Sequence, residues 1–185
     1  LVTRYKDRVR CWELWNEPWN MGYNWHADRF DYGPLAKRTY EAIKAVDGTA
    51  FLGAYNWCIN LYSNDFPGGI SYKEFFDANV AHPYASSAPE GYYLQIWLPF
   101  DQSQANMSNT GQEWDTEQVP GIGLGIQYSN PQKYANWLVR TYAMAMAWGV
   151  DRYCYFDFDD WCLGEGGGGS GLINPDGTPR PGYVA

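Results

Sequence analysis

The sequence has little positive charge, only two histidines and no long hydrophobic run. It contains 13 Lys and Arg against 21 Asp and Glu, which gives a formal net charge of −8 and a pI near 4.6. Without a basic stripe to neutralise phosphates, nucleic acid and anionic membrane surfaces are excluded as main partners. No apolar run approaches the roughly 20 residues that a membrane-spanning helix needs.

Cysteine is also scarce, and its spacing has no recognisable pattern. The four cysteines are Cys11, Cys58, Cys154 and Cys162. They form no CxxC pair and no zinc-site spacing, and they are too few to define a disulfide scaffold. Buried free thiols and one or two bridges both remain open, so cysteine usage does not indicate the redox compartment.

Two further signals are missing, a leader peptide and a phosphate-binding loop. The chain starts at Leu1 and no charged-then-apolar segment precedes the first motif, so we expect a mature form or a fragment. The glycine-rich segment 164–171 lacks the Lys-Ser/Thr pair of a phosphate-binding loop, and no clear helix follows it. We therefore expect no nucleotide site, no metal and no cofactor.

Aromatic residues, by contrast, are abundant. Ten Trp, 16 Tyr and 8 Phe make up 18% of the chain. The polar ends of Trp and Tyr favour a wet boundary over a dry core, so this content indicates an aromatic-lined binding cleft.

Short apolar runs alternate with amphipathic stretches along the chain, which predicts an α/β fold of one domain. Strands are expected at 8–15, 50–55, 79–84, 112–117 and 151–158. Helices are expected at 34–46, at 71–76 after a capping box, and from Asn130-Pro131 to Trp148, ending at Gly149. In the segment 85–111 only 94–98 has a helical character.

Two of these strands end in similar acidic motifs. Trp15-Asn16-Glu17-Pro18 ends the first strand, and Trp114-Asp115-Thr116-Glu117 ends the fourth. Each glutamate alone is compatible with a solvated or salt-bridged group. Together, two carboxyl groups at strand ends beside tryptophans match the acid and the nucleophile that glycoside hydrolysis requires.

These motifs resemble the clan A retaining glycoside hydrolases. Trp15-Asn16-Glu17-Pro18 is similar to their acid/base motif after barrel strand four, and Asp115-Thr116-Glu117 to their nucleophile strand, the seventh. Ala81-His82-Pro83-Tyr84 resembles the sixth-strand motif, and 172–183 resembles the closing segment of such barrels. The motifs do not separate a family 39-like from a family 5-like enzyme.

The resemblance implies a TIM (β/α)8 barrel of which residues 1–185 hold strands four to eight, with the first three βα units absent. The spacing agrees, because the 100 positions from Glu17 to Glu117 divide into three units of about 33 residues, as in a barrel of ~250 residues. An open sheet exposes its edges, so we expect this piece to be poorly stable or inactive alone.

The resemblance also implies roles for single residues. Glu17 would be the general acid and then the general base, and Glu117 the nucleophile, with their carboxyl groups about 5 Å apart. Asn16 would bind the sugar 2-hydroxyl, and His82 or Tyr84 would orient the nucleophile.

The roles of several other aromatic and acidic residues stay open. Trp161 is either a sugar platform or a capping aromatic, and His82 is also compatible with an ordinary core position. The acidic cluster at Asp157, Asp159 and Asp160 fits a solvated edge, a sugar subsite or a divalent-cation site.

A regular strand cannot aim all of these side chains correctly. Asn16 and Glu17 are adjacent, yet both are needed in the cleft, so we expect an irregular backbone there. Alternation also places Glu113 and Asp115 on the same face as Glu117, which predicts a bulge or a basic partner for Asp115.

The expected function is hydrolysis of β-linked oligosaccharide or polysaccharide with retention of configuration. Two alternatives are a non-catalytic carbohydrate-binding barrel and a transglycosylase. The sequence does not name the sugar, the choice of endo or exo attack or the oligomeric state. A secreted or extracellular location is expected for an enzyme of this kind.

Overall fold

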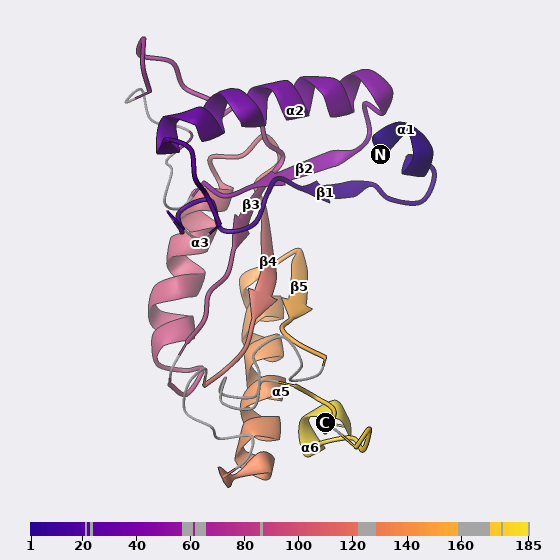
Figure 1. Ribbon diagram of the computed structural model, residues 1–185. Helices are drawn as coiled ribbons and strands as arrows, with labels where there is room; N and C mark the ends of the chain where they lie inside the picture. The colour runs from indigo at the N-terminus through magenta and orange to yellow at the C-terminus, as the bar shows by residue number, and fades with distance from the viewer. Residues whose placement is uncertain are drawn as a thin grey trace. The chain divides into compact units, whose positions relative to one another are not determined.

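The computed structural model describes residues 1–20, 22, 24–56, 61, 66–85, 87–121, 129–158, 171–174 and 176–184. The chain divides into two compact units, Leu1–Ala81 with Asp101–Trp114, and His82–Phe100 with Asp115–Ala185. Strands and helices alternate along the chain, except that no helix is described between β2 (Phe51–Ala54) and β3 (Ala78–Ala81). The strand order β1-β2-β3-β4-β5 follows the sequence. This is the predicted βα repetition (Figure 1).

The first unit is built on a parallel sheet beside one long helix. Its elements are α1 (Val2–Tyr5), β1 (Cys11–Glu13), η1 (Arg29–Asp31), α2 (Tyr32–Val46), β2 (Phe51–Ala54), β3 (Ala78–Ala81) and most of α3 (Leu98–Ala105). Cys11 pairs with Phe51 and Gly53 with Ala78, both in parallel register. The amphipathic helix α2 buries Tyr32, Gly33, Ala36 and Ile43, and Figure 1 shows it running along β1 and β2.

A glycine in β2 lets a large aromatic side chain pack on the sheet. A Cβ atom at Gly53 would lie 2.6 Å from Trp114 Cε3 and 2.6 Å from Val80 Cγ2, closer than side chains tolerate. Trp114 is only 2% exposed and packs with Leu52 and Val80 in the core of this unit. The tryptophan of the Trp114-Asp115-Thr116-Glu117 motif is therefore a core residue.

The second unit contains the remaining elements. These are η2 (Tyr93–Trp97), the end of β4 (Gln112–Gln118), α5 (Pro131–Trp148), β5 (Arg152–Tyr155) and α6 (Pro181–Val184). The ends of α5 are as predicted: the Asn130 side chain accepts a hydrogen bond from the Lys133 N–H at 3.0 Å, and Gly149 ends the helix with a φ of 79°. Tyr134, Ala135, Trp137 and Leu138 are buried on the inner face of α5.

Some expected element boundaries were wrong. The segment 71–76 is a turn and not a helix, because Tyr72 and Phe76 are drawn into the core and only Phe75 N–H to Tyr72 O (3.0 Å) closes a turn. The first and fifth strands are shorter than predicted. The segment that showed helical character at 94–98 is helical, as η2 followed by α3.

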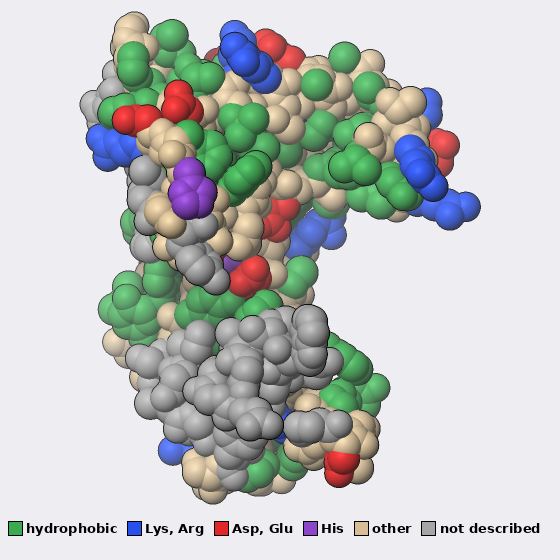
Figure 2. Space-filling model, viewed as in Figure 1, with side chains coloured by type: hydrophobic (Ala, Val, Ile, Leu, Met, Phe, Trp, Pro, Cys, Tyr) green, Lys and Arg blue, Asp and Glu red, His purple; other side chains and the backbone are tan. Residues whose placement is uncertain are grey.

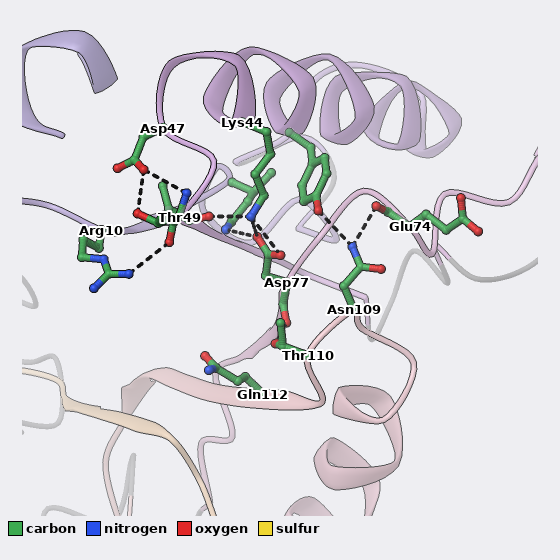
Figure 3. A network of polar contacts seen from close by, with 12 residues as sticks. Arg10, Lys44, Asp47, Thr49, Glu74, Asp77, Asn109, Thr110 and Gln112 are labelled. Carbon is green, nitrogen blue, oxygen red and sulfur yellow. Dashed lines mark hydrogen bonds and ion pairs between the residues drawn. The ribbon is translucent and has the colours of Figure 1, made fainter.

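Buried polar contacts join α2 to the sheet of the first unit (Figure 3). Asp77 is 3% exposed, accepts a hydrogen bond from the Leu52 N–H at 2.8 Å and lies 3.0 Å from Lys44 Nζ. Lys44 also donates to the carbonyl of Ala50 at 2.6 Å. These contacts join α2 to β2 and to the residue that precedes β3.

The outer surface of the first unit carries exposed apolar side chains beside its charged ones. A hollow of about 500 Å³ opens between α1, β1 and α2, lined by Leu1, Val2, Thr3, Trp12, Glu13, Arg38, Thr39, Ala42, Ile43, Val46 and Leu52. Figure 2 shows hydrophobic side chains gathered at this end of α2, with Lys and Arg around them. Among the residues that the structure describes, no helix has the length and apolarity to cross a bilayer.

Candidate active site

The backbone becomes irregular immediately after β1, at the first acidic motif. The Leu14 N–H still donates to the Gly53 carbonyl at 2.9 Å, but Trp15 and Glu17 have φ angles of 67° and 44°. Left-handed backbone at residues other than glycine costs about 1–3 kcal/mol each, so surrounding contacts must hold it. The predicted irregularity at Asn16 and Glu17 is confirmed, and the alternation of the strand does not govern where Glu17 points.

A short loop supplies the contacts that hold this turn. Asn24 Nδ2 donates to Glu17 Oε2 at 3.1 Å, and Trp15 Nε1 donates to the backbone carbonyl of Asn24 at 2.8 Å. The Asn20 N–H donates to the Glu17 carbonyl at 2.9 Å. Glu17 is half-buried, and the neighbouring Asn16 is exposed.

Tryptophan and tyrosine rings surround the turn. Trp15 meets Trp25 edge-on with ring centres 5.5 Å apart, and Trp25 meets Tyr32 in the same way at 5.8 Å. The Tyr32 hydroxyl donates to the Leu14 carbonyl at 2.9 Å, and burial raises the pKa of this phenol far above its usual value, so it stays a neutral donor. Trp25 and Tyr32 are core residues, whereas Trp15 is 54% exposed.

The second unit brings together three of the predicted site residues. Glu117, near the end of β4, accepts a hydrogen bond from the Tyr84 hydroxyl at 2.7 Å, and His82 Nδ1 lies 3.4 Å from the same Oε2 atom. The His82 side chain is 1% exposed and that of Glu117 is 26% exposed. A carboxylate that is open to solvent is thus fixed from one side by two buried or half-buried groups.

The positions of His82 and Tyr84 follow from the end of β3. His82 comes directly after Ala81, and the Tyr84 N–H donates to the His82 carbonyl at 2.8 Å, which places both side chains at the same strand end. His82 Nε2 also lies 3.2 Å from Thr116 Oγ1, so the imidazole contacts two successive residues of β4. The parallel bridge of Ala85 with Pro120 fixes these two segments side by side.

The two other acids of β4 are buried and hydrogen-bonded. In the first unit, Glu113 accepts from Asn79 Nδ2 at 2.7 Å, and both residues are at most 1% exposed. In the second unit, Asp115 accepts from the Tyr93 hydroxyl at 2.7 Å. This partner is a tyrosine, whereas the sequence analysis considered a basic residue. No motif in the segment 85–111 had marked Tyr93 as a partner of Asp115.

Three tyrosine hydroxyl groups of the second unit form hydrogen bonds, one of them to Gln118, the residue after Glu117. The Tyr153 hydroxyl donates to Gln118, and the hydroxyls of Tyr134 and Tyr155 bond to each other. Burial is the main cause that raises the pKa values of Tyr153 and Tyr155, and neighbouring phenols add to it. Tyr153 and Tyr155 therefore remain neutral hydrogen-bonding groups.

Several predicted residues lie outside the described part of the chain. These are Trp161, Asp159, Asp160, Cys58, Cys162 and residues 164–170 of the glycine-rich segment. Of the acidic cluster only Asp157 is described, and it is 8% exposed. Cys11 is half-buried and Cys154 is exposed. Within the described residues of either unit alone, no three side chains that could bind a metal ion lie together.

Comparisons with known proteins identify the fold. No protein-family model and no curated protein sequence matches the chain. Solved structures do match: a family 39 glycoside hydrolase from Bacteroides cellulosilyticus WH2 (TM-score 0.70, 21% identity, 98% of this chain and 40% of that one) and a GH39 β-xylosidase from Caulobacter crescentus (0.61, 21%, 100% and 43%). The GH51 α-L-arabinofuranosidase from Thermotoga petrophila RKU-1 also matches (0.64, 15%, 93% and 38%).

The match extends over nearly all of this chain but less than half of each neighbour. The chain spans about 40% of the length of the glycoside hydrolases that it resembles. At identities of 15–21% the similarity establishes the fold and leaves the reaction to the chemistry of the site. The chain therefore has the βα architecture of the C-terminal part of a TIM barrel, as found in glycoside hydrolases of families 39 and 51.

Proposed function

We propose that the protein is a retaining glycoside hydrolase that cleaves β-glycosidic bonds, with Glu117 as nucleophile and Glu17 as acid/base residue. The observation that carries the proposal is the fixed position of Glu117, which accepts a hydrogen bond from Tyr84 and contacts the buried His82. A nucleophile must meet the sugar in one geometry, and a carboxylate fixed on one side satisfies this requirement.

The chemistry proceeds in two displacements. Glu117 attacks the anomeric carbon while Glu17 gives its proton to the leaving oxygen, and a glycosyl-enzyme ester forms. Water then attacks the anomeric carbon while Glu17 takes a proton from it, and the bond between this carbon and Glu117 breaks and releases the Glu117 carboxylate. The Tyr84 hydroxyl binds one oxygen of Glu117, leaves the other for attack, and stabilises the carboxylate when it is released.

The surroundings of Glu17 support the acid/base assignment. Its carboxyl group is half-buried, held by a neutral amide, and mounted on a strained turn beside Trp15. Strained backbone that is held by neighbouring contacts is concentrated at functional sites. We propose that the adjacent Asn16, which is exposed, binds the sugar 2-hydroxyl and that Trp161 stacks on a sugar face.

Aryl glycosides test the proposal in the protein produced from its complete reading frame. The structural neighbours include a β-xylosidase, an α-L-arabinofuranosidase and an exo-β-1,4-mannosidase, and the first panel of p-nitrophenyl glycosides is chosen to match these sugars. We expect hydrolysis of at least one β-glycoside, with NMR showing the β-anomer as the first product. Inversion, or no turnover of any glycoside, would refute the assignment.

A transglycosylase and a non-catalytic sugar-binding barrel are the competing functions. The first would use the same ester intermediate but transfer the sugar to an added acceptor, which product analysis with and without acceptor detects. The second would bind sugars without turnover, and the fixed Glu117 argues against it because binding alone needs no oriented nucleophile.

We also propose a location outside the cytoplasm, where polysaccharide substrates occur.

A further inference from the structure

Two hydrogen bonds join the turn that carries Glu17 to one loop residue, Asn24. Its side-chain Nδ2 donates to Glu17 Oε2 at 3.1 Å, and its backbone carbonyl accepts from Trp15 Nε1 at 2.8 Å. The two residues that it contacts are the two with positive φ angles, 67° at Trp15 and 44° at Glu17. One residue thus contacts both strained positions of the acidic motif.

Asn24 is itself held in place by the same loop. Its N–H donates to the Asn20 carbonyl at 3.0 Å, and the Asn20 N–H donates to the Glu17 carbonyl at 2.9 Å. The bonds form a closed circuit from Glu17 through Asn20 to Asn24 and back to the Glu17 carboxyl group. The Asn24 amide therefore has a defined direction toward one carboxyl oxygen.

We infer that Asn24 is a positioning residue for the acid/base Glu17, an inference that rests on the function proposed above. Because Asn24 Nδ2 donates a hydrogen bond to Glu17 Oε2, this oxygen is the acceptor in the protonated carboxyl group. The proton that Glu17 transfers is then carried by Oε1. In the first displacement this proton moves from Oε1 to the leaving oxygen as that oxygen takes the electron pair of the breaking bond to the anomeric carbon. In the second, Oε1 takes a proton from the attacking water.

The chemistry of an amide suits this task in both half-reactions. A neutral N–H can donate to Oε2 whether Glu17 is ionised or protonated, because the carbonyl-type oxygen of a neutral carboxyl group is still an acceptor. A lysine or arginine at this place would favour the ionised carboxylate and oppose its role as an acid. An aspartate has the same shape as asparagine but offers oxygen in place of the donor, and its charge would repel Glu17.

Comparing two substrates with different leaving groups distinguishes a positioning role of Asn24 from a purely structural one. A 2,4-dinitrophenyl glycoside leaves without protonation, whereas a phenyl glycoside depends on the general acid. We expect N24A to lower kcat/KM for the phenyl glycoside about tenfold, the size of one lost hydrogen bond, and to leave the dinitrophenyl glycoside within about twofold. Both variants keep the backbone carbonyl that accepts from Trp15, but N24D should show a larger split, because its carboxylate removes the donor and also repels Glu17.

Reference variants make the outcomes distinguishable. E17Q should show the same split at greater magnitude, and N136A, an exposed asparagine on α5, should change neither substrate. If E17Q splits the substrates and both Asn24 variants lower them equally, Asn24 is merely structural and the inference is overturned. If E17Q shows no split, or the unaltered protein hydrolyses neither substrate, the proposed function itself fails.

Discussion

The hydroxyl of Tyr84 donates a hydrogen bond of 2.7 Å to Oε2 of Glu117. The donor follows β3 and the acceptor lies on β4, 33 positions further along the chain, so the contact exists only because these strand ends meet. His82 approaches the same oxygen to 3.4 Å from a buried position. The carboxylate is held by neighbours that its own strand does not provide, and this arrangement makes specific predictions.

Removing the Tyr84 hydroxyl should slow turnover more than it weakens binding. Tyr84→Phe keeps the ring but leaves Glu117 Oε2 without this donor, so we expect kcat to fall about 10- to 100-fold while KM changes little. Steady-state kinetics with the best aryl glycoside measures both values. Tyr5→Phe, an exposed tyrosine on α1, is the matched control. Equal loss in both variants would show that the hydroxyl of Tyr84 has no specific role.

Replacing the proposed nucleophile should abolish turnover and preserve sugar binding. Glu117→Gln is close in shape, and its amide cannot form the ester, so we expect at least a 10³-fold loss of kcat. Calorimetric binding of the substrate should remain within a few-fold of that of the unaltered protein. Glu74→Gln, an exposed residue, is the control. Hydrolysis by Glu117→Gln at an unchanged rate would exclude the nucleophile assignment.

The contacts of Asp77 should contribute strongly to the stability of the first unit. Asp77→Ala leaves the Leu52 N–H and the half-buried Lys44 ammonium without this acceptor, and we expect a loss of about 2–4 kcal/mol in the free energy of unfolding. Urea unfolding followed by circular dichroism measures it. The exposed pair of Lys37 and Glu41 on α2 provides the comparison, because Glu41→Gln should change stability by less than about 0.5 kcal/mol. Similar losses in both variants would contradict the account.

One ion pair on the second unit should make stability depend on pH. The bidentate contact with Arg140 lowers the pKa of Glu90, and Glu90 in turn raises that of Arg140. A lowered folded-state pKa gives stability that is present above the usual pKa of glutamate and is lost as pH falls through the lowered value. Both side chains are more than 40% exposed, so the contribution should stay below about 1 kcal/mol.

Comparison of Arg140→Gln with the unaltered protein tests this pH effect. We expect the two free energies of unfolding to differ at pH 6 and to converge in acid, and 0.5 M salt should reduce the difference at pH 6. A difference that persists at pH 2 would mean that packing of the Arg140 side chain, and not its charge, stabilises the protein.

The order of the elements could be predicted from the sequence because the hydrophobic runs and helix ends are local signals. Asn130, Pro131 and Gly149 mark α5 by the chemistry of its ends alone, and the structure places those ends where they were predicted. The segment 71–76 shows the limit of this approach. Its capping box favours a helix, but burial of Tyr72 and Phe76 in the core overrides that local preference.

The candidate site was predictable as a set of motifs but not as a set of contacts. Glu117, His82 and Tyr84 stood out in the sequence, and the structure brings these three together. Asn24 and Tyr93 did not stand out, because each acts on an acid through a fold-dependent contact. Asn24 contacts Glu17 from seven positions further along the chain, and Tyr93 contacts Asp115 from η2. Neither segment carries a strong periodic pattern.

Trapping the covalent intermediate tests the central claim most directly. A 2-deoxy-2-fluoro-β-glycoside with a dinitrophenyl leaving group, made for the sugar that the aryl panel identifies, slows breakdown of the ester and lets it accumulate. We predict that mass spectrometry of the digested protein finds one fluoroglycosyl group, attached to Glu117. An adduct on another carboxyl group, or hydrolysis of the parent glycoside with no adduct, would contradict the account.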